Sequence, residues 1–102
     1  MTKPLMLDLD LRRLIREESV VSFLQPLVSA KRKAVFAVEA LVRGFLPQAS
    51  LYLPPGLLFS LVRDEETRLA LDRLCRKKAF EAFAPVHRAN RQIMLSINID
   101  AA

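Results

Sequence analysis

Cysteine, glycine and histidine are scarce in this chain, and each scarcity excludes a class of protein. The single cysteine, Cys75, rules out an internal disulfide and offers no metal-binding pair. No Gly-rich stretch of the kind that binds phosphates is present. The sequence also contains no Cys or His cluster and no nucleophile beside a plausible base. Disulfide-stabilised domains, P-loop proteins and the usual nucleophilic hydrolases are therefore excluded.

Long apolar runs are absent as well. The best candidate, residues 57–62, is far too short to cross a membrane and follows Pro54 and Pro55. Acidic residues occur near the start, where a signal peptide would have its apolar run. We therefore expect no membrane segment in this chain and, from the lone cysteine, a cytoplasmic location.

The composition indicates one small globular domain. Hydrophobic residues make up 52% and charged residues 26% of the 102 residues. The apolar share is high for this size, so either the core is dense or apolar surface is left for something else to cover. A formal net charge of +5 favours anionic partners, but the Lys and Arg residues are scattered along the sequence. They are not interleaved with aromatic residues, so we expect no DNA or RNA partner.

The stretch around which the chain is organised is residues 35–44, Val-Phe-Ala-Val-Glu-Ala-Leu-Val-Arg-Gly, which favours a β-strand. Side chains alternate along a strand, so Glu39, Leu41 and Arg43 share one face. A carboxylate among apolar neighbours is costly unless a metal, a cation or hydrogen bonds compensate. Glu39 therefore has either a structural partner or a function. Arg43 is a poor candidate for that partner, because the strand separates the two Cα atoms by about 13 Å.

A helix and a further strand precede this central strand. Asp10 can cap the helix, which should end near residues 18–19. We therefore divide the chain into a leading helical segment, residues 1–19, and the remaining portion, residues 20–102. Residues 23–29 read as a strand, and Pro26 marks it as an edge or irregular strand.

The two strands should pair as a hairpin. Residues 30–33 form a polar turn between them. If the turn is symmetric about Arg32, Gln25 lies across from Glu39 on the same face.

Two helices follow the hairpin. After an irregular loop over residues 45–55, residues 56–62 favour a short helix, and Asp64 caps a longer one whose apolar spacing continues to Pro85. We expect the basic residues of the longer helix to form a solvated face. His87 is expected in a polar loop, without a chemical role.

The last element, residues 92–100, alternates between apolar and polar side chains, with Asn98 on the polar face. The residues alone thus predict an α/β unit in the order helix-strand-strand-helix-helix-strand. Four polar side chains gather on one face of its sheet: Gln25, Glu39, Arg43 and Asn98.

Three motifs carry a resemblance to a known family. Phe-Leu-Gln-Pro-Leu-Val at residues 23–28, Glu-Ala-Leu-Val-Arg at 39–43 and Leu-Ser-Ile-Asn-Ile at 95–99 resemble the opening third of the EAL domain, the bacterial cyclic-di-GMP phosphodiesterase. Three motifs in order, at the family's spacing, are far more specific than Glu-Ala-Leu alone. We interpret residues 1–102 as the N-terminal fragment of one such domain.

The resemblance implies a partial TIM-like barrel whose first strand is antiparallel to the rest and which the strands present leave incomplete. It implies that Glu39 and Asn98 are metal ligands, and that Gln25, Leu41 and Arg43 contact cyclic-di-GMP. In the complete enzyme, two Mg²⁺ or Mn²⁺ ions activate a water that attacks one phosphodiester, and the product is the linear dinucleotide.

The sequence departs from the family pattern in two ways. Gly44 and Phe45 stand where many members have Trp and a His-Pro loop. The family's other acidic ligands, and a Lys thought to assist the water, lie on later strands that this chain lacks. Because Mg²⁺ requires near-octahedral oxygen coordination, we expect the fragment to be inactive by itself and to bind cyclic-di-GMP weakly or not at all.

Three readings remain. The chain is a fragment of an active phosphodiesterase, or its parent is a degenerate EAL domain that binds cyclic-di-GMP without cleaving it, or the short chain is itself an interaction module with no nucleotide role. In each case the three predicted strands are too few to close a TIM-type barrel. Unpaired strand edges and an uncovered apolar face favour a homodimer or larger oligomer. That face should carry Phe23, Leu27, Val35, Leu41 and Met94.

Overall fold

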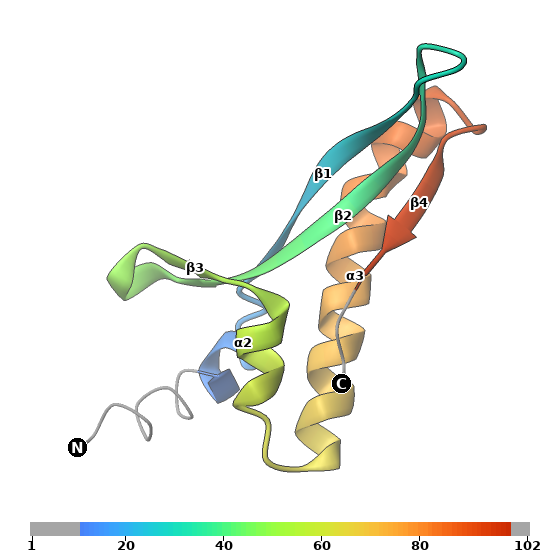
Figure 1. Cartoon of the computed structure of the whole chain (residues 1–102). Helices are drawn as coiled ribbons and strands as arrows, with labels where there is room; N and C mark the ends of the chain where they lie inside the picture. The colour runs from blue at the N-terminus through green and yellow to red at the C-terminus, as the bar shows by residue number, and fades with distance from the viewer. Residues whose placement is uncertain (1–10, 99–102) are drawn as a thin grey trace.

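The computed structural model describes residues 11–98, which form one open β-sheet with helices packed against one face (Figure 1). Residues 11–16 are helical, as expected, whereas the predicted cap Asp10 lies outside the described residues. The elements that follow are β1 (Val20–Ser29), β2 (Ala34–Leu46), the 3₁₀ turn η1 (Pro47–Ala49), β3 (Leu51–Leu53), α2 (Pro55–Ser60), α3 (Glu65–Ala89) and β4 (Met94–Ile97). The predicted α/β class is confirmed, with β3 as an additional strand.

β1 and β2 form the predicted hairpin. They pair antiparallel, with Gln25 opposite Glu39 as predicted. The turn itself is not symmetric about Arg32, since Val28 pairs with Val35, and the bulge between Leu27 and Val28 produces the predicted register. Lys33 takes a positive φ of 53° where the turn at residues 30–33 closes. Among the described strands β1 pairs only with β2, so it is the edge strand that Pro26 indicated.

β4 lies on the other side of β2 and runs parallel to it, from the Met94–Ala37 pair to the Ile97–Ala40 pair. The first strand is therefore antiparallel to its neighbour while the next pair is parallel, as predicted for a partial TIM-like barrel. The sheet remains open, because the described strands do not close into a ring. None of the described helices is long and apolar enough to span a membrane.

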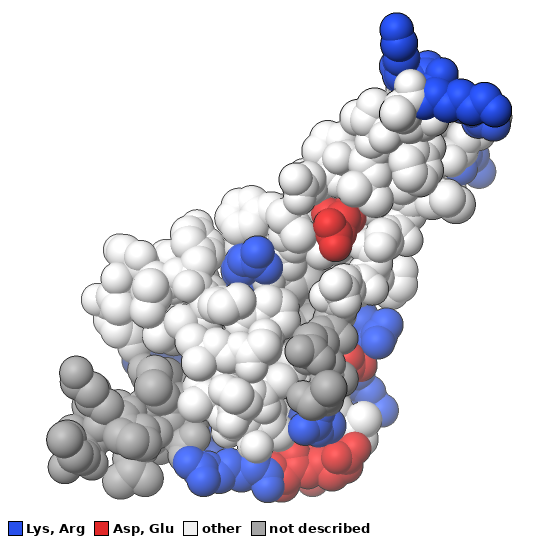
Figure 2. Space-filling view, viewed as in Figure 1, with Lys and Arg blue, Asp and Glu red and all other residues white. Residues whose placement is uncertain are grey.

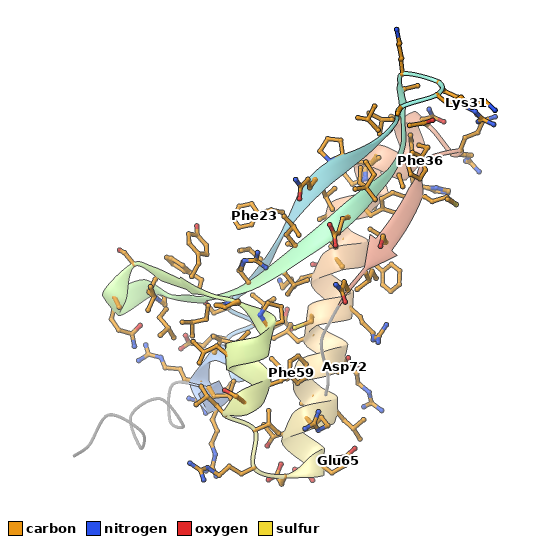
Figure 3. The ribbon with its side chains drawn as sticks, in the orientation of Figure 1. Phe23, Lys31, Phe36, Phe59, Glu65 and Asp72 are labelled. Atoms are coloured by element: carbon orange, nitrogen blue, oxygen red, sulfur yellow. The ribbon has the colours of Figure 1, made fainter. Side chains whose placement is uncertain are left out.

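The hydrophobic core lies between the sheet and the helices. Every second residue of β2 from Val38 to Leu46 is buried. Ala40, Val42 and Leu46 belong to the same cluster as the fully buried Leu58 of α2 and Leu71 of α3. Phe59 lies between α2 and α3 in the same core (Figure 3). On this face of the sheet the apolar residues therefore form a dense core, which is one of the two explanations given above for their high share.

The prediction of an irregular loop over residues 45–55 was wrong. β2 continues to Leu46, and after η1 the chain returns as β3, antiparallel to the end of β2. Phe45 and Tyr52 stack across this second hairpin, with ring centroids 4.9 Å apart. The prolines of this stretch misled the interpretation, because they flank the short strand rather than interrupt it.

The predicted end of the long helix was also wrong. α3 continues through Pro85 to Ala89, and His87 lies in its last turn against Phe83, with ring centroids 5.8 Å apart, rather than in a loop. A proline removes one backbone donor. Pro85 is exposed and close to the end, and the turn after it is closed by the Asn90 N–H bond to the Val86 carbonyl.

Candidate functional site

The face of β2 that points away from the helices carries the candidate residues. Glu39, Leu41 and Arg43 alternate with the buried Ala40 and Val42 and are all half-buried. The predicted division of the strand into two faces is confirmed over this part of β2. Glu39 is thus held at a fixed position by strand pairing on both of its sides.

Glu39 and Arg43 line a single pocket with Asn98, which follows the last residue of β4. The pocket has a volume of about 200 Å³, and α2 contributes Pro55 and Gly56 at its first turn. Active sites of TIM-type barrels lie at the carboxyl ends of the strands. The position of Asn98 just beyond β4 agrees with that arrangement.

Glu39 makes no ion pair with another described residue. Arg43 does not reach it, and its Nη1 atom instead donates a 2.7 Å hydrogen bond to the Val42 carbonyl oxygen. The expectation that the strand keeps these two charges apart is thus borne out. A half-buried carboxylate without a charged partner is costly, and this cost favours a functional reading of Glu39.

The predicted residues differ in how closely they approach this pocket. Leu41 lines it, and Phe23 lies opposite Leu41 on β1. Gln25 is the cross-strand neighbour of Glu39 but is exposed and does not line the pocket. Asn98 is also exposed, with β4 placing Ser96 beside Glu39.

The sequence interpretation missed two contributors, Pro55 and Gly56. Their signal was the Pro54-Pro55 pair, which fixes where α2 begins and brings its first turn to the pocket wall. A glycine there leaves open space, since a Cβ at Gly56 would meet nothing within 4 Å.

The described residues contain no group of three or more His, Cys, Asp or Glu side chains that would hold a metal ion. Glu39 and Asn98 supply a carboxylate and an amide oxygen, which are donors of the kind that Mg²⁺ and Mn²⁺ prefer. The pair fits part of such a coordination shell and is too small to complete one.

A larger pocket, of about 370 Å³, lies between the helical residues 11–16 and the end of β2. Its charged lining residues, Arg13 and Glu17, pair with each other at 3.1 Å and are both well exposed. No buried or unpartnered charge among the described residues lines it, so we assign it no chemistry.

The open sheet, the antiparallel first strand and the pocket beside the middle of β2 and the carboxyl end of β4 define a partial TIM-like α/β unit. The chain belongs to the EAL domain family, whose model matches residues 8–102. No curated protein matches the chain significantly.

Solved structures of the EAL enzyme Bd1971 share this fold. The form with cAMP and cyclic-di-GMP bound has a TM-score of 0.71, the cAMP-bound form 0.70 and the cGMP-bound form 0.69, each at 22% sequence identity. Each alignment covers 95% of this chain but only 28% of the Bd1971 chain. The chain therefore spans little more than a quarter of the length of the structures it matches.

Proposed function

We propose that this chain is the N-terminal part of a cytoplasmic bacterial EAL phosphodiesterase and contributes one wall of its cyclic-di-GMP site. Membership of the EAL family supports a cyclic-di-GMP phosphodiesterase-type function. The observation that carries the proposal is that Glu39, Arg43 and Asn98, from two different motifs, line one pocket.

Each side chain has a role that suits its chemistry. Glu39 and Asn98 would hold Mg²⁺ or Mn²⁺ by their oxygens, and a bound ion would supply an activated water and charge stabilisation at the phosphodiester. Arg43 is a guanidinium at the pocket wall and binds a phosphate oxygen. Gln25 and Leu41 position the rest of the nucleotide.

Metal binding is tested by adding substoichiometric Mn²⁺ and recording which backbone amide NMR signals it broadens. Broadening centred on Glu39 and Asn98, and lost in Glu39→Gln, is expected. Glu66→Gln, which removes an exposed carboxylate at the start of α3, is the matched control and should leave the pattern unchanged. Broadening that survives Glu39→Gln at the same amides overturns the assignment.

Nucleotide binding is tested in the same spectra with cyclic-di-GMP. Shifts at Gln25, Leu41 and Arg43 are expected at high ligand concentration only, because the far wall of the pocket is missing. Arg43→Ala should abolish them, whereas Arg73→Ala, an exposed arginine of α3, should not. Identical shifts in the Arg43→Ala protein would refute the role of Arg43.

The chain by itself should have no phosphodiesterase activity, because two side-chain ligands cannot assemble a two-metal site. Incubation with cyclic-di-GMP and Mn²⁺, followed by chromatography of the linear dinucleotide, measures this. Product formation that Glu39→Ala removes would show that the chain completes its own site, contrary to our expectation.

A degenerate EAL domain that binds cyclic-di-GMP without cleavage is the second candidate, since the described residues lack a full ligand set. Nucleotide shifts without any Mn²⁺ broadening at Glu39 would favour it. We further propose that the chain self-associates through its uncovered sheet face, on which Phe23, Tyr52 and Met94 are exposed.

A further inference from the structure

One end of the molecule carries five exposed cations, which we call the basic tip: Lys31, Arg32, Lys33, Arg88 and Arg91. The first three form the turn between β1 and β2, and the other two lie in the last turn of α3 and in the α3–β4 turn. Because β2 and β4 are parallel, their starting ends lie together, so the two turns are neighbours. Figure 2 shows Lys and Arg side chains gathered at this end of the molecule.

The basic tip accounts for the whole net charge of the chain. The chain has 16 Lys and Arg residues against 11 Asp and Glu residues, and the five tip cations equal its formal net charge of +5. The remaining cations and acids balance. No Asp or Glu occurs in residues 26–38 or 82–98, the segments that form this end.

The tip cations are not neutralised by neighbours. None of them forms a salt bridge with another described residue, unlike Lys77, whose Nζ lies 3.1 Å from a Glu18 oxygen. A cluster of unpaired cations with no acid nearby produces a local positive potential that attracts anionic surfaces.

Exposed apolar side chains lie directly behind the cations. Val28 and Val35 face each other across the hairpin and are 60% and 43% exposed, and the adjacent Phe36 is 42% exposed. Phe36 has no partner on β1, because the register jumps from Ala37 to Val35 at a β-bulge. A bulge re-aims the side chain it displaces, and Figure 3 shows Phe36 on the part of β2 next to the hairpin turn.

We propose that the basic tip binds the surface of an anionic lipid bilayer. Cations at the headgroups together with apolar side chains at the acyl boundary are the combination that favours peripheral membrane binding. A nucleic acid would use the cations but leave the exposed Val28 and Val35 without a contact, since it is bound by grooves and aromatic stacking platforms. The candidate active-site pocket stays accessible, because six residues of extended strand set Glu39 roughly 20 Å from the turn.

The test measures how the 102-residue chain partitions onto vesicles by flotation. Vesicles of phosphatidylcholine alone are compared with vesicles of phosphatidylcholine and phosphatidylserine, at low and high salt. Binding to the anionic vesicles that high salt weakens is expected. Replacing Lys31, Arg32 and Lys33 together by Gln should lower the partition coefficient on the order of 100-fold, because each cation near an anionic surface contributes roughly fivefold.

A matched variant replaces three exposed arginines elsewhere, Arg12, Arg16 and Arg73, by Gln and has the same net charge. It should bind almost as the unaltered chain does. Phe36→Ser tests the apolar share and should weaken binding while leaving its salt dependence intact. Three outcomes overturn the proposal: equal binding to neutral vesicles, an equal loss in the matched variant, or tighter binding to a nucleic-acid duplex than to the anionic vesicles.

Discussion

At the scale of single residues, Gly44 fixes how closely the sheet approaches the helices. A Cβ at this position would lie 3.0 Å from Leu14 Cδ1 and 3.0 Å from both terminal methyls of Leu58. Gly44 is buried, and its φ is not positive, so the glycine is needed for space rather than for backbone conformation. Close packing against Leu14 and Leu58 therefore favours glycine at position 44 in this chain.

Gly44→Val should destabilise the protein by about 1–3 kcal/mol, because its methyls overpack the contact between β2, Leu14 and Leu58. Gly44→Ala should cost less. Urea unfolding followed by circular dichroism measures both. Gly56→Ala serves as the control, since its Cβ meets nothing within 4 Å and it lies in α2; it should be neutral or stabilise by up to about 1 kcal/mol. Equal losses at the two glycines would refute the packing argument.

Cys75 gives a prediction for high pH. Burial, with a smaller contribution from the Asp72 carboxylate, raises the pKa of this thiol from 9.0 to about 11. The folded protein thus holds the thiol proton more tightly than the unfolded chain does. Its contribution to stability is complete below pH 9 and is lost as the pH rises toward 11.

The measurement is the unfolding free energy of the unaltered chain and of Cys75→Ala across this range. The difference between the two should narrow or reverse above pH 9. If the unfolding free energies of the two proteins changed with pH in parallel, Cys75 would not contribute to the pH dependence of stability. At neutral pH the folded thiol should also resist aqueous alkylating reagents until urea is added.

At the scale of the elements, local signals start α3 and tie it to the segment before β1. The Asp64 carboxylate accepts a 2.7 Å hydrogen bond from the Thr67 backbone N–H, and Glu65 and Glu66 complement the helix dipole. Glu18 has a positive φ of 53° before β1, and its carboxylate pairs with Lys77 on α3. These exposed contacts orient the helix, while its buried stripe supplies most of the stability.

Asp64→Ala should lower the thermal midpoint, because it removes the N-cap, whereas Asp64→Asn keeps a capping oxygen and should be close to neutral. The hydrogen bonds from Thr67 lower the pKa of Asp64 below its usual value of 3.8. Its stabilising effect is therefore present above pH 3.8 and is lost as the pH falls through the lower folded-state pKa. The Ala variant should lack that acid sensitivity in calorimetric scans at decreasing pH; an undiminished acid transition would contradict the assignment.

At the scale of the whole molecule, the sheet face opposite the helices is uncovered. Phe23, Tyr52 and Met94 are 49%, 51% and 61% exposed on β1, β3 and β4. Phe23 and Tyr52 contact each other edge to face, with ring centroids 5.7 Å apart, and Phe23 projects from β1 in Figure 3. Apolar side chains at such exposure on one face favour contact with a second surface.

We expect the isolated chain to form a homodimer or larger oligomer that covers this face. Light scattering over a dilution series should show a concentration-dependent mass. Phe23→Lys, which places a charge on the face and on an edge strand, should shift the equilibrium toward monomer. Leu69→Lys, at an exposed apolar site on α3, is the control and should not. A monomer that unfolds cooperatively at micromolar concentration would contradict this expectation.

Features that depend on neighbours along the chain could be predicted from the sequence. Alternation over residues 35–44 assigned Glu39 and Arg43 to one face, and the polar residues 30–33 located the hairpin turn. The register that places Gln25 opposite Glu39 also needs the bulge between Leu27 and Val28, which the sequence did not reveal. Asp64 marked the start of α3. Strand periodicity, turn length and capping are all short-range, so these features could be predicted without a fold.

Contacts between segments that are distant in the sequence, in contrast, depend on the tertiary fold. It brought Asn98 to the Glu39 pocket through the parallel pairing of β4 with β2, and the first turn of α2 through the pairing of β3 with the end of β2. It carried α3 through Pro85, because a proline at an exposed position near a helix end costs a single hydrogen bond. It also brought Arg88 and Arg91 beside the consecutive cations Lys31, Arg32 and Lys33, because the parallel pairing of β4 with β2 places the α3–β4 turn next to the hairpin turn.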